Sequence, residues 1–182
     1  MPPVDKPLGL VSGLLELGRN MNNKFDWQIK TFSQLTTDEL YDFLKLRIDV
    51  FVVEQTCYYP DLDDLDRDSE ARHIFAYNEG NMIAYCRVLA PEVVYNDESA
   101  IGRVIVDSSY RGKGLAYELM MQALAVTKEY WPNHPCHISA QQHLSDFYQR
   151  LGFEPISEMY LEDGIPHVGM RRLATSQTDQ KE

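Results

Sequence analysis

The sequence is poor in the features that mark secreted and membrane-bound proteins. It has only three cysteines, Cys57, Cys86 and Cys136, which form neither a Cys-x-x-Cys pair nor a metal-ligand cluster. An odd, scattered set of cysteines is typical of reduced thiols, so we expect a cytoplasmic protein without disulfides. No apolar run approaches the roughly 20 residues that span a bilayer. Leu8–Leu17 is the only candidate leader, and because it contains Glu16 and no small-residue cleavage site follows it, we expect neither a membrane span nor secretion.

Basic residues are also scarce. The chain has 17 Lys and Arg against 28 Asp and Glu, and its formal net charge is −11. Because nucleic-acid binding depends on Lys and Arg that neutralise phosphates, we expect no nucleic-acid partner. Two interpretations of the acidity remain open. It attracts cationic partners such as amines, polyamines or basic peptides, or it simply keeps the protein soluble.

The length of 182 residues fits one domain with a sizeable core. A capping box at Thr36–Glu39 predicts a helix whose buried face carries Leu40, Phe43, Leu44, Ile48 and Phe51. A second helix is predicted over Leu115–Tyr130, and a short third one over Leu144–Leu151, ended by Gly152. Apolar alternation and turn signals predict seven strands: Trp27–Phe32, Arg72–Asn78, Met82–Ala90, Ala100–Val106, His137–Ala140, Phe153–Tyr160 and His167–Leu173. This order indicates a mixed α/β (α+β) domain.

Two terminal segments are left out of this domain. Residues 1–24 are either a native extension or a segment left from cloning, with Met21 as the true start. The polar tail at 175–182 is expected to be disordered. The predicted domain therefore covers residues 25–174.

The most informative segment is Val104–Ala116, where a buried strand runs through a turn directly into a helix. Gly112 and Gly114 leave the amides of the turn open to close approach by a ligand. The helix N-terminus adds free N–H donors and a partial positive charge, and Arg111 and Lys113 add full charges. Together these features predict a site for a phosphate or pyrophosphate, although an ordinary strand–helix turn would have the same pattern.

Two common phosphate motifs do not fit this segment. A P-loop requires Ser or Thr after Gly-Lys, and Lys113 is followed by Gly114. A dinucleotide fingerprint requires a third glycine in Gly-x-Gly-x-x-Gly, and Tyr117 stands at that position.

Two signatures in this order resemble the GNAT superfamily of N-acetyltransferases. Arg111–Ala116 resembles its [Gln/Arg]-x-x-Gly-x-[Gly/Ala] motif, and Tyr148–Phe153 resembles its later Tyr-x-x-x-Gly-Phe motif. Further segments are similar to the small ElaA-like branch: Phe51–Gln55, Arg72–Ile74, Ile101–Val106 and Glu162–His167. The resemblance covers about Phe25 to Leu173. It implies a mostly antiparallel, twisted sheet flanked by helices, with splayed parallel strands that form an acyl-CoA cleft.

The same resemblance implies an enzyme that moves the acetyl group of acetyl-CoA, its co-substrate, directly to an amine on a small molecule or peptide, without a metal. Its expected cofactor-binding residues are Val104, Ile105, Val106, Arg111, Gly112, Lys113, Gly114, Leu115, Ala116 and Gln141. At the position of Gln141 many members have Asn, which puts that contact in doubt. A homodimer would be in keeping with the superfamily.

Tyr148 is implied as the general acid that protonates the leaving thiolate. From the residues alone, a packed tyrosine with one satisfied hydroxyl is the alternative. The general base is less clear: Glu54 and His73 are candidates, a structural role is open for each, and His167 and Glu158 are weaker candidates. An ordered water chain is the other possibility.

Two arginines near these candidates also need an interpretation. Arg47 either pairs with a carboxylate, which we favour, or points into a polar cleft, and Arg103 is expected to face the substrate side. If both face the cleft, they would favour an acceptor that carries a carboxylate or phosphate. The aspartates of Glu54–Glu70 match no EF-hand register, so we expect a solvated loop, perhaps an acceptor lid, without calcium.

Two competing functions remain. A domain of the same fold could bind acyl-CoA without turnover, as a sensor or interaction module, or it could synthesise acylated signals, a resemblance carried only by Leu46–Gln55. The tyrosine at 148 favours the enzyme, because a pure binding module has no need of an acid.

Overall fold

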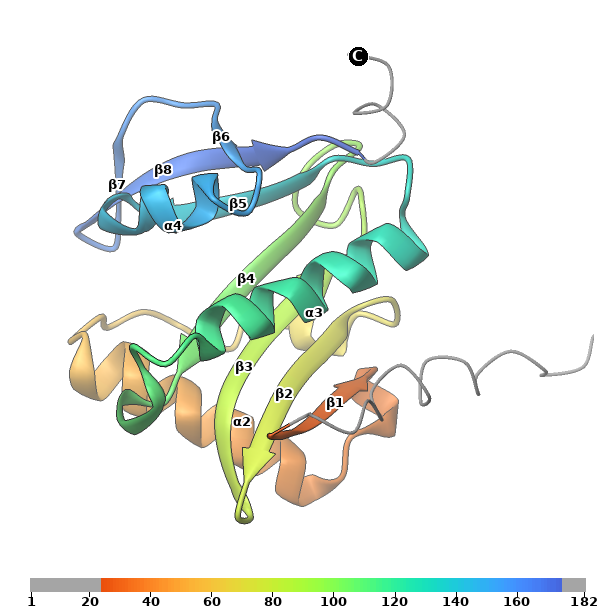
Figure 1. The fold of residues 1–182 in the computed structure, drawn as a ribbon, viewed down its shortest axis with the longest axis vertical. Coiled ribbons are helices and arrows are strands. Elements are labelled where there is room, and N and C mark those ends of the chain that lie inside the picture. Colours follow the sequence, from red (N-terminus) through yellow and green to blue (C-terminus); the bar gives the residue numbers. More distant parts are fainter. Residues whose placement is uncertain (1–23, 175–182) are drawn as a thin grey trace, which may run out of the picture.

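The computed structural model describes residues 24–174 (Figure 1). The expectations for residues 1–23 and for the tail at 175–182 therefore concern residues outside the described range. One eight-stranded sheet has the order β1-β2-β3-β4-β5-β8-β6, and β7 pairs with β8. The strands are β1 (Asp26–Lys30), β2 (Arg72–Asn78), β3 (Asn81–Leu89), β4 (Ser99–Val106), β5 (Cys136–Gln141), β6 (Glu154–Pro155), β7 (Tyr160–Glu162) and β8 (Ile165–Arg172). All neighbours are antiparallel except β4 and β5, so the expected mixed, mostly antiparallel sheet is confirmed.

The helices cover both faces of this sheet (Figure 1). The two long helices are α2 (Thr37–Arg47), which continues as the π-helix η2 (Ile48–Glu54), and α3 (Leu115–Tyr130). A third helix, α4 (Ser145–Gln149), is short. Single 3-10 turns complete the set: η1 (Phe32–Gln34), η3 (Leu65–Arg67), η4 (Ser108–Tyr110) and η5 (Gln142–Leu144). One core cluster packs α3 and α4 against one face, and a second packs α2 and η2 against the other.

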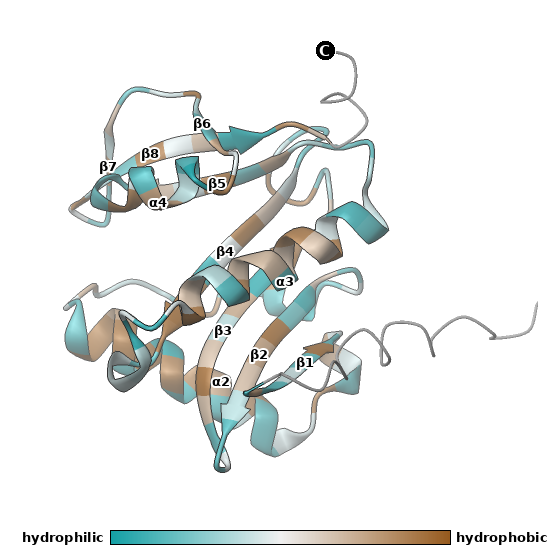
Figure 2. Cartoon of the chain, viewed as in Figure 1, coloured by the Kyte–Doolittle hydropathy of each residue, from teal (hydrophilic) through white to brown (hydrophobic). Residues whose placement is uncertain are grey.

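Because side chains alternate between the two faces of a strand, each strand contributes residues to both cores. On β2, Ile74 and Ala76 belong to the α3 side and Phe75 to the α2 side. In Figure 2 brown residues appear on β2, β3 and α3, whereas the β2–β3 turn is teal. The sheet is therefore apolar on both faces, as expected for a layer with helices on each side.

The capping box before α2 is confirmed, since Thr36 and Glu39 exchange backbone–side-chain bonds of 2.9 and 3.1 Å. The predicted buried face is only partly right: Phe43 is buried, but Ile48 is 45% exposed. Ile48 lies roughly 140° round the helix from Phe43, since an α-helix has about 3.6 residues per turn, and so it points away from the core. The helix then becomes a π-helix, marked by the bond from Gln55 N to Val50 O.

The predicted strand Phe153–Tyr160 is wrong as a single element. The structure has β6 at Glu154–Pro155 and β7 at Tyr160–Glu162, and both pair with β8. Pro155 has no N–H to donate, which limits ladder pairing at this edge.

Candidate functional site

Strands β4 and β5 begin as a parallel pair and then diverge (Figure 1). Only Ser99–Cys136 and Ala100–His137 pair between them. Beyond these residues the strands separate, and a cleft of about 340 Å³ opens between them, which we call the β4–β5 cleft. The backbone groups of β4 that face this cleft have no strand partner there, so they are available to a ligand.

A β-bulge in β4 lies at the wall of this cleft. The pairing of β3 with β4 shifts between Tyr85 and Arg87, and Arg103 on the bulge has a φ of +55°. A left-handed backbone at a non-glycine residue inside a strand is strained and persists only where the surroundings hold it. Here the Arg103 side chain is held by ion pairs with Asp61 and Asp63.

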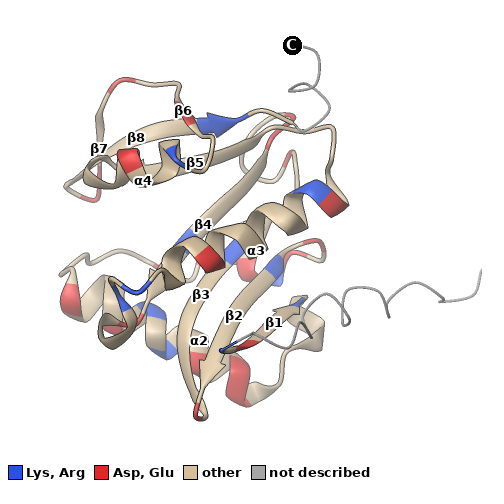
Figure 3. Cartoon of the chain, in the orientation of Figure 1, with Lys and Arg blue, Asp and Glu red and all other residues tan. Residues whose placement is uncertain are grey.

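The predicted anion site lies at the N-terminus of α3. Gly112 and Gly114 have φ values of +72° and +86°, and a Cβ on either would meet nothing within 4 Å. Gly114 is the N-cap and offers no side-chain cap to the 16-residue helix, so the amides of the first turn are open. Figure 3 shows basic residues on the loop that leads into α3. Open space, free amides and a helix dipole fit a pyrophosphate.

The two basic residues of this loop have partners within the chain. Lys113 Nζ donates to Ser109 O at 2.9 Å, and Arg111 Nε donates to Val106 O at 2.9 Å. Arg111 also forms an ion pair with Glu54, with 2.9 Å between Nη2 and Oε2. The charge of Arg111 is thus partly compensated, and the Arg111 guanidinium lowers the pKa of Glu54 below its ordinary value. A carboxylate held in this way is a poor base.

Tyr148 of α4 lines the β4–β5 cleft and is 7% exposed. No other described residue forms a hydrogen bond with its hydroxyl that would compete with a ligand. Burial raises the pKa of Tyr148, which keeps the phenol protonated at neutral pH. Tyr148 also packs edge-on against Phe147 and Phe153, so the ring is fixed in place.

Of the other expected cofactor-binding residues, Val104 and Gln141 also line the cleft. Gln141 Nε2 donates to Gln55 Oε1 at 3.3 Å, which joins β5 to the end of η2. Ile105, Val106 and Leu115 are buried. The structure therefore brings Val104, Gln141 and Tyr148 to one cleft.

His73 lies away from this cleft. It is 0% exposed, its Nδ1 accepts from Tyr85 Oη at 2.8 Å, and its Nε2–H donates to Asp66 O at 2.9 Å. Burial lowers the pKa of His73, so the neutral ring is favoured. Since both ring nitrogens are occupied inside the protein, His73 does not face the cleft and its role is structural.

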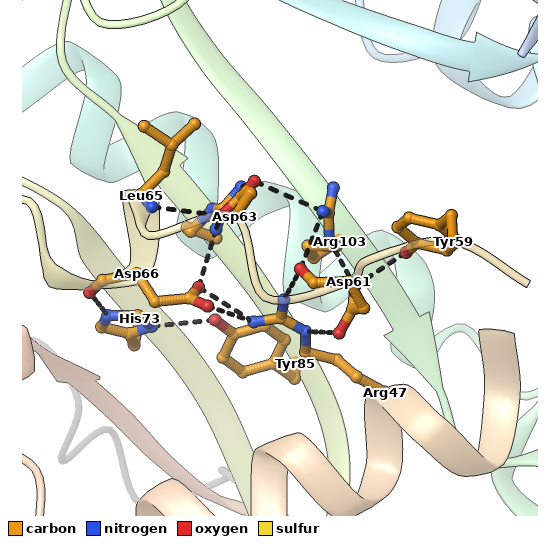
Figure 4. Close-up of polar contacts among 10 residues, drawn as sticks. Arg47, Tyr59, Asp61, Asp63, Leu65, Asp66, His73, Tyr85 and Arg103 are labelled. Carbon is orange, nitrogen blue, oxygen red and sulfur yellow. Dashed lines mark hydrogen bonds and ion pairs between the residues drawn. The ribbon is translucent and has the colours of Figure 1, made fainter. Parts of the chain in front are cut away.

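A buried arginine–aspartate network fills the region between α2, β3 and β4 (Figure 4). It joins three arginines to three aspartates: Arg47, Arg87, Arg103, Asp61, Asp63 and Asp66. Arg47 is 0% exposed and bonds Asp61 and Asp66, so the expected pairing of Arg47 is confirmed.

The expectation of a solvated aspartate loop is therefore only partly right, since Asp64 is exposed. Asp61 and Asp66 are buried, because they compensate arginines that the sheet and α2 also bury. Although burial opposes it, the Arg47 guanidinium lowers the pKa of Asp61. Asp63 and Leu65 of this loop line the β4–β5 cleft, so the loop forms part of the cleft wall.

The sequence interpretation missed a polar row on β5. His137 and Ser139 line the cleft, as do Glu162 of β7 and His167 of β8, whereas Glu158 does not. His137 Nδ1 lies 2.7 Å from Glu98 Oε2. The alternation of His137, Ser139 and Gln141 along a predicted strand was the available signal for a shared face.

Within residues 24–174, no group of three or more His, Cys, Asp or Glu side chains could hold a metal ion. In the same part of the chain, no helix has both the length and the apolar character needed to cross a bilayer.

Comparisons with known proteins agree with this geometry. A family model of the acetyltransferase (GNAT) domain matches residues 42–174. Protein ElaA of Escherichia coli is 42% identical over 147 residues, which cover 81% of this chain and 95% of ElaA. The crystal structure of E. coli ElaA has a TM-score of 0.77, with 42% identity over 81% of this chain and 99% of that one.

Two further solved structures are informative. An acyl-CoA N-acyltransferase from Pseudomonas aeruginosa is 45% identical and has a TM-score of 0.78, covering 81% of this chain and 99% of its own. The CoA-dependent acyl-homoserine lactone synthase BjaI has a TM-score of 0.68 at 18% identity, covering 85% of each chain. At that identity the second match shows a common fold alone.

Proposed function

Because the chain belongs to the GNAT acetyltransferase family, we propose that it transfers the acetyl group of acetyl-CoA directly to an amine, with Tyr148 as the general acid. The observation that carries this proposal is the position of Tyr148. It is a buried tyrosine with an uncommitted hydroxyl, in the cleft that opens where β4 and β5 diverge.

Acetyl-CoA, when bound, would supply an activated acyl group as a thioester. The loop of Arg111–Ala116 would bind its pyrophosphate through the free amides of Gly112, Gly114 and the first turn of α3. The edge of β4 at Val104–Val106 that has no β5 partner would hold the pantetheine arm, and an amide near the bulge would stabilise negative charge that develops on the carbonyl oxygen. Gln141, at the end of β5, is placed to assist through its amide.

Tyr148 then donates its hydroxyl proton to the sulfur as the carbon–sulfur bond breaks. The amine must first lose a proton, because an alkylammonium has a pKa near 10.4. We assign this step to water in the open cleft rather than to Glu54 or His73. The first is paired with Arg111 and the second is buried within the network.

A tyrosine-to-phenylalanine pair tests the acid. Tyr148→Phe should lower the rate of thiol release from acetyl-CoA by about 100-fold, the lower end for a positioned acid, and leave CoA affinity within about twofold. The control is Tyr41→Phe on α2, because Tyr41 is 69% exposed and lies outside both the cleft lining and the loop before α3. If Tyr148→Phe turns over at the parental rate, Tyr148 has no part in the mechanism.

The same assay separates the enzyme from a non-catalytic acyl-CoA-binding module. A module would bind CoA but release no thiol above the hydrolysis rate with any amine.

We also propose that the protein is cytoplasmic, because the three cysteines at 57, 86 and 136 are free thiols.

A further inference from the structure

The cationic side chains that line the β4–β5 cleft are already compensated. Among the described residues, Arg87 and Arg103 are the only Lys or Arg in that lining. Arg87 donates to both oxygens of Asp63 and to Asp66, each at 2.7 Å. Arg103 donates from Nε to Asp61 at 2.8 Å and from Nη2 to Asp63 at 3.3 Å. An acceptor carboxylate would therefore have to compete with aspartates that belong to a buried network.

The opposite wall of the cleft is acidic. Glu162 lines it and accepts a hydrogen bond of 2.7 Å from Ser139 Oγ, which also lies 2.5 Å from Tyr160 Oη. Asp163 lines the cleft beside it, and neither carboxylate has a Lys or Arg partner among the described residues. His137 also lines the cleft, and its Nδ1 lies 2.7 Å from Oε2 of Glu98, a carboxylate that also pairs with Arg171 outside the cleft lining.

The field of these carboxylates reaches the facing wall. Cys57, which follows η2 and also lines the cleft, has a pKa raised first by burial and then by Asp163 and Glu162. A group that enters between the two walls is therefore exposed to uncompensated negative charge. Such a field attracts an ammonium group and repels a carboxylate.

We propose that the acceptor is a primary amine with no carboxylate near its nitrogen, and that Glu162, oriented by Ser139, binds it as the ammonium ion. This inference rests on the proposed acetyl transfer and names the class of acceptor for the same cleft. It also decides between the two acceptor types that the sequence left open, because the arginines that would have favoured a carboxylate are neutralised.

Three amines that share one side chain test the role of charge. Thiol release from acetyl-CoA is measured with tyramine, tyrosinamide and tyrosine, across a range of pH that separates amine ionisation from binding. Tyrosinamide matches tyrosine in size but has a neutral carboxamide in place of the carboxylate. We expect kcat/KM for tyramine and tyrosinamide to exceed that for tyrosine by at least about tenfold. The same order is expected for agmatine, argininamide and arginine.

A matched pair of variants tests Glu162 itself. Glu162→Gln should raise KM for tyramine about tenfold, because one charge-assisted hydrogen bond is lost, and should narrow the preference for tyramine over tyrosine. Glu158→Gln makes the same change of net charge outside the cleft lining and should leave both values unchanged. Equal effects of the two variants would assign the preference to overall charge and overturn the role of Glu162.

The remaining outcomes are also decisive. Tyrosine used as well as tyrosinamide would overturn the proposed acceptor class, while acetyl transfer itself would stand. Turnover of neither series would likewise overturn the class. The proposed function would then still be decided separately, by CoA affinity and by thiol release with other amines.

Discussion

Two groups of arginines bound to carboxylates differ in burial. In the buried arginine–aspartate network, Arg47 and Arg87 are 0% and 3% exposed, and each bonds two aspartates. At the loop before α3, the side chains of Arg111 and Glu54 are 41% and 43% exposed and form one pair. The same chemistry is therefore buried in the cleft wall in one place and exposed at the proposed pyrophosphate loop in the other.

The physical reason is the dielectric environment. A buried charge without its partner is costly, so the network holds the aspartate loop, α2 and the β4 bulge in one arrangement. An exposed pair contributes little and is easily exchanged for a ligand phosphate. Rigid walls beside an exchangeable anion site are what a cleft for an anionic co-substrate requires.

The largest expected difference between the buried network and the exposed pair is in their contribution to the free energy of unfolding. Asp66→Asn keeps the shape of the side chain but leaves Arg47 and Arg87 short of a negative charge, and it should lower the free energy of unfolding by about 3–5 kcal/mol. Glu54→Gln should cost less than about 1 kcal/mol. Urea unfolding of both variants measures the contrast, and equal small losses would show that the network is not a structural element.

Two glycine variants test the anion loop. Both replace a glycine that has a positive φ, so both introduce a similar backbone strain. Gly114→Val should weaken CoA binding by about tenfold or more, because a side chain would occupy the open space at the amides. Gly80→Val, at a φ of +79° and also with nothing within 4 Å of its Cβ, carries similar strain in the β2–β3 turn. Calorimetric titration with CoA should detect a loss only for Gly114→Val, and equal losses would place the anion elsewhere.

The network also predicts how stability depends on pH. The folded-state pKa of His73 is lowered by burial, so the folded state binds fewer protons than the unfolded state. Its contribution is complete above the unfolded value of about 6.5 and is lost as the pH falls through the lower folded value. Asp61 and Asp63, whose pKa values are also lowered, add a second loss below about 3.9.

Replacing His73 isolates the upper window. His73→Gln should flatten the decline in the free energy of unfolding just below about pH 6.5. His143→Gln, at an exposed position, should leave that decline unchanged. Urea unfolding at a series of pH values gives both curves. An unchanged slope in His73→Gln would contradict a neutral, buried ring.

The smallest effect is expected at the exposed pair. Glu54→Gln should strengthen CoA binding about twofold to threefold, because the charge of Arg111 becomes free for a phosphate. Arg111→Gln should weaken it by a similar factor. If Glu54 were the general base, Glu54→Gln would instead lower turnover by 100-fold or so, and initial rates with saturating amine distinguish the two.

Local features of the fold could be predicted from the sequence. The capping box at Thr36, the bounds of β2 and α3 and the two glycines of the anion loop each depend on neighbours along the chain. The buried network could not be predicted, because its partners lie 14 to 42 residues apart and become neighbours only through the sheet. Nor could the change to a π-helix at Ile48, for which the local sequence carries no distinct signal.

The structure of the protein bound to desulfo-CoA tests the central claim most directly. The account predicts a pyrophosphate within hydrogen-bond distance of the amides at Gly112 and Gly114, with the end of the pantetheine arm between β4 and β5 beside the Tyr148 hydroxyl. A ligand bound at any other surface, or an arm that ends away from Tyr148, would contradict it.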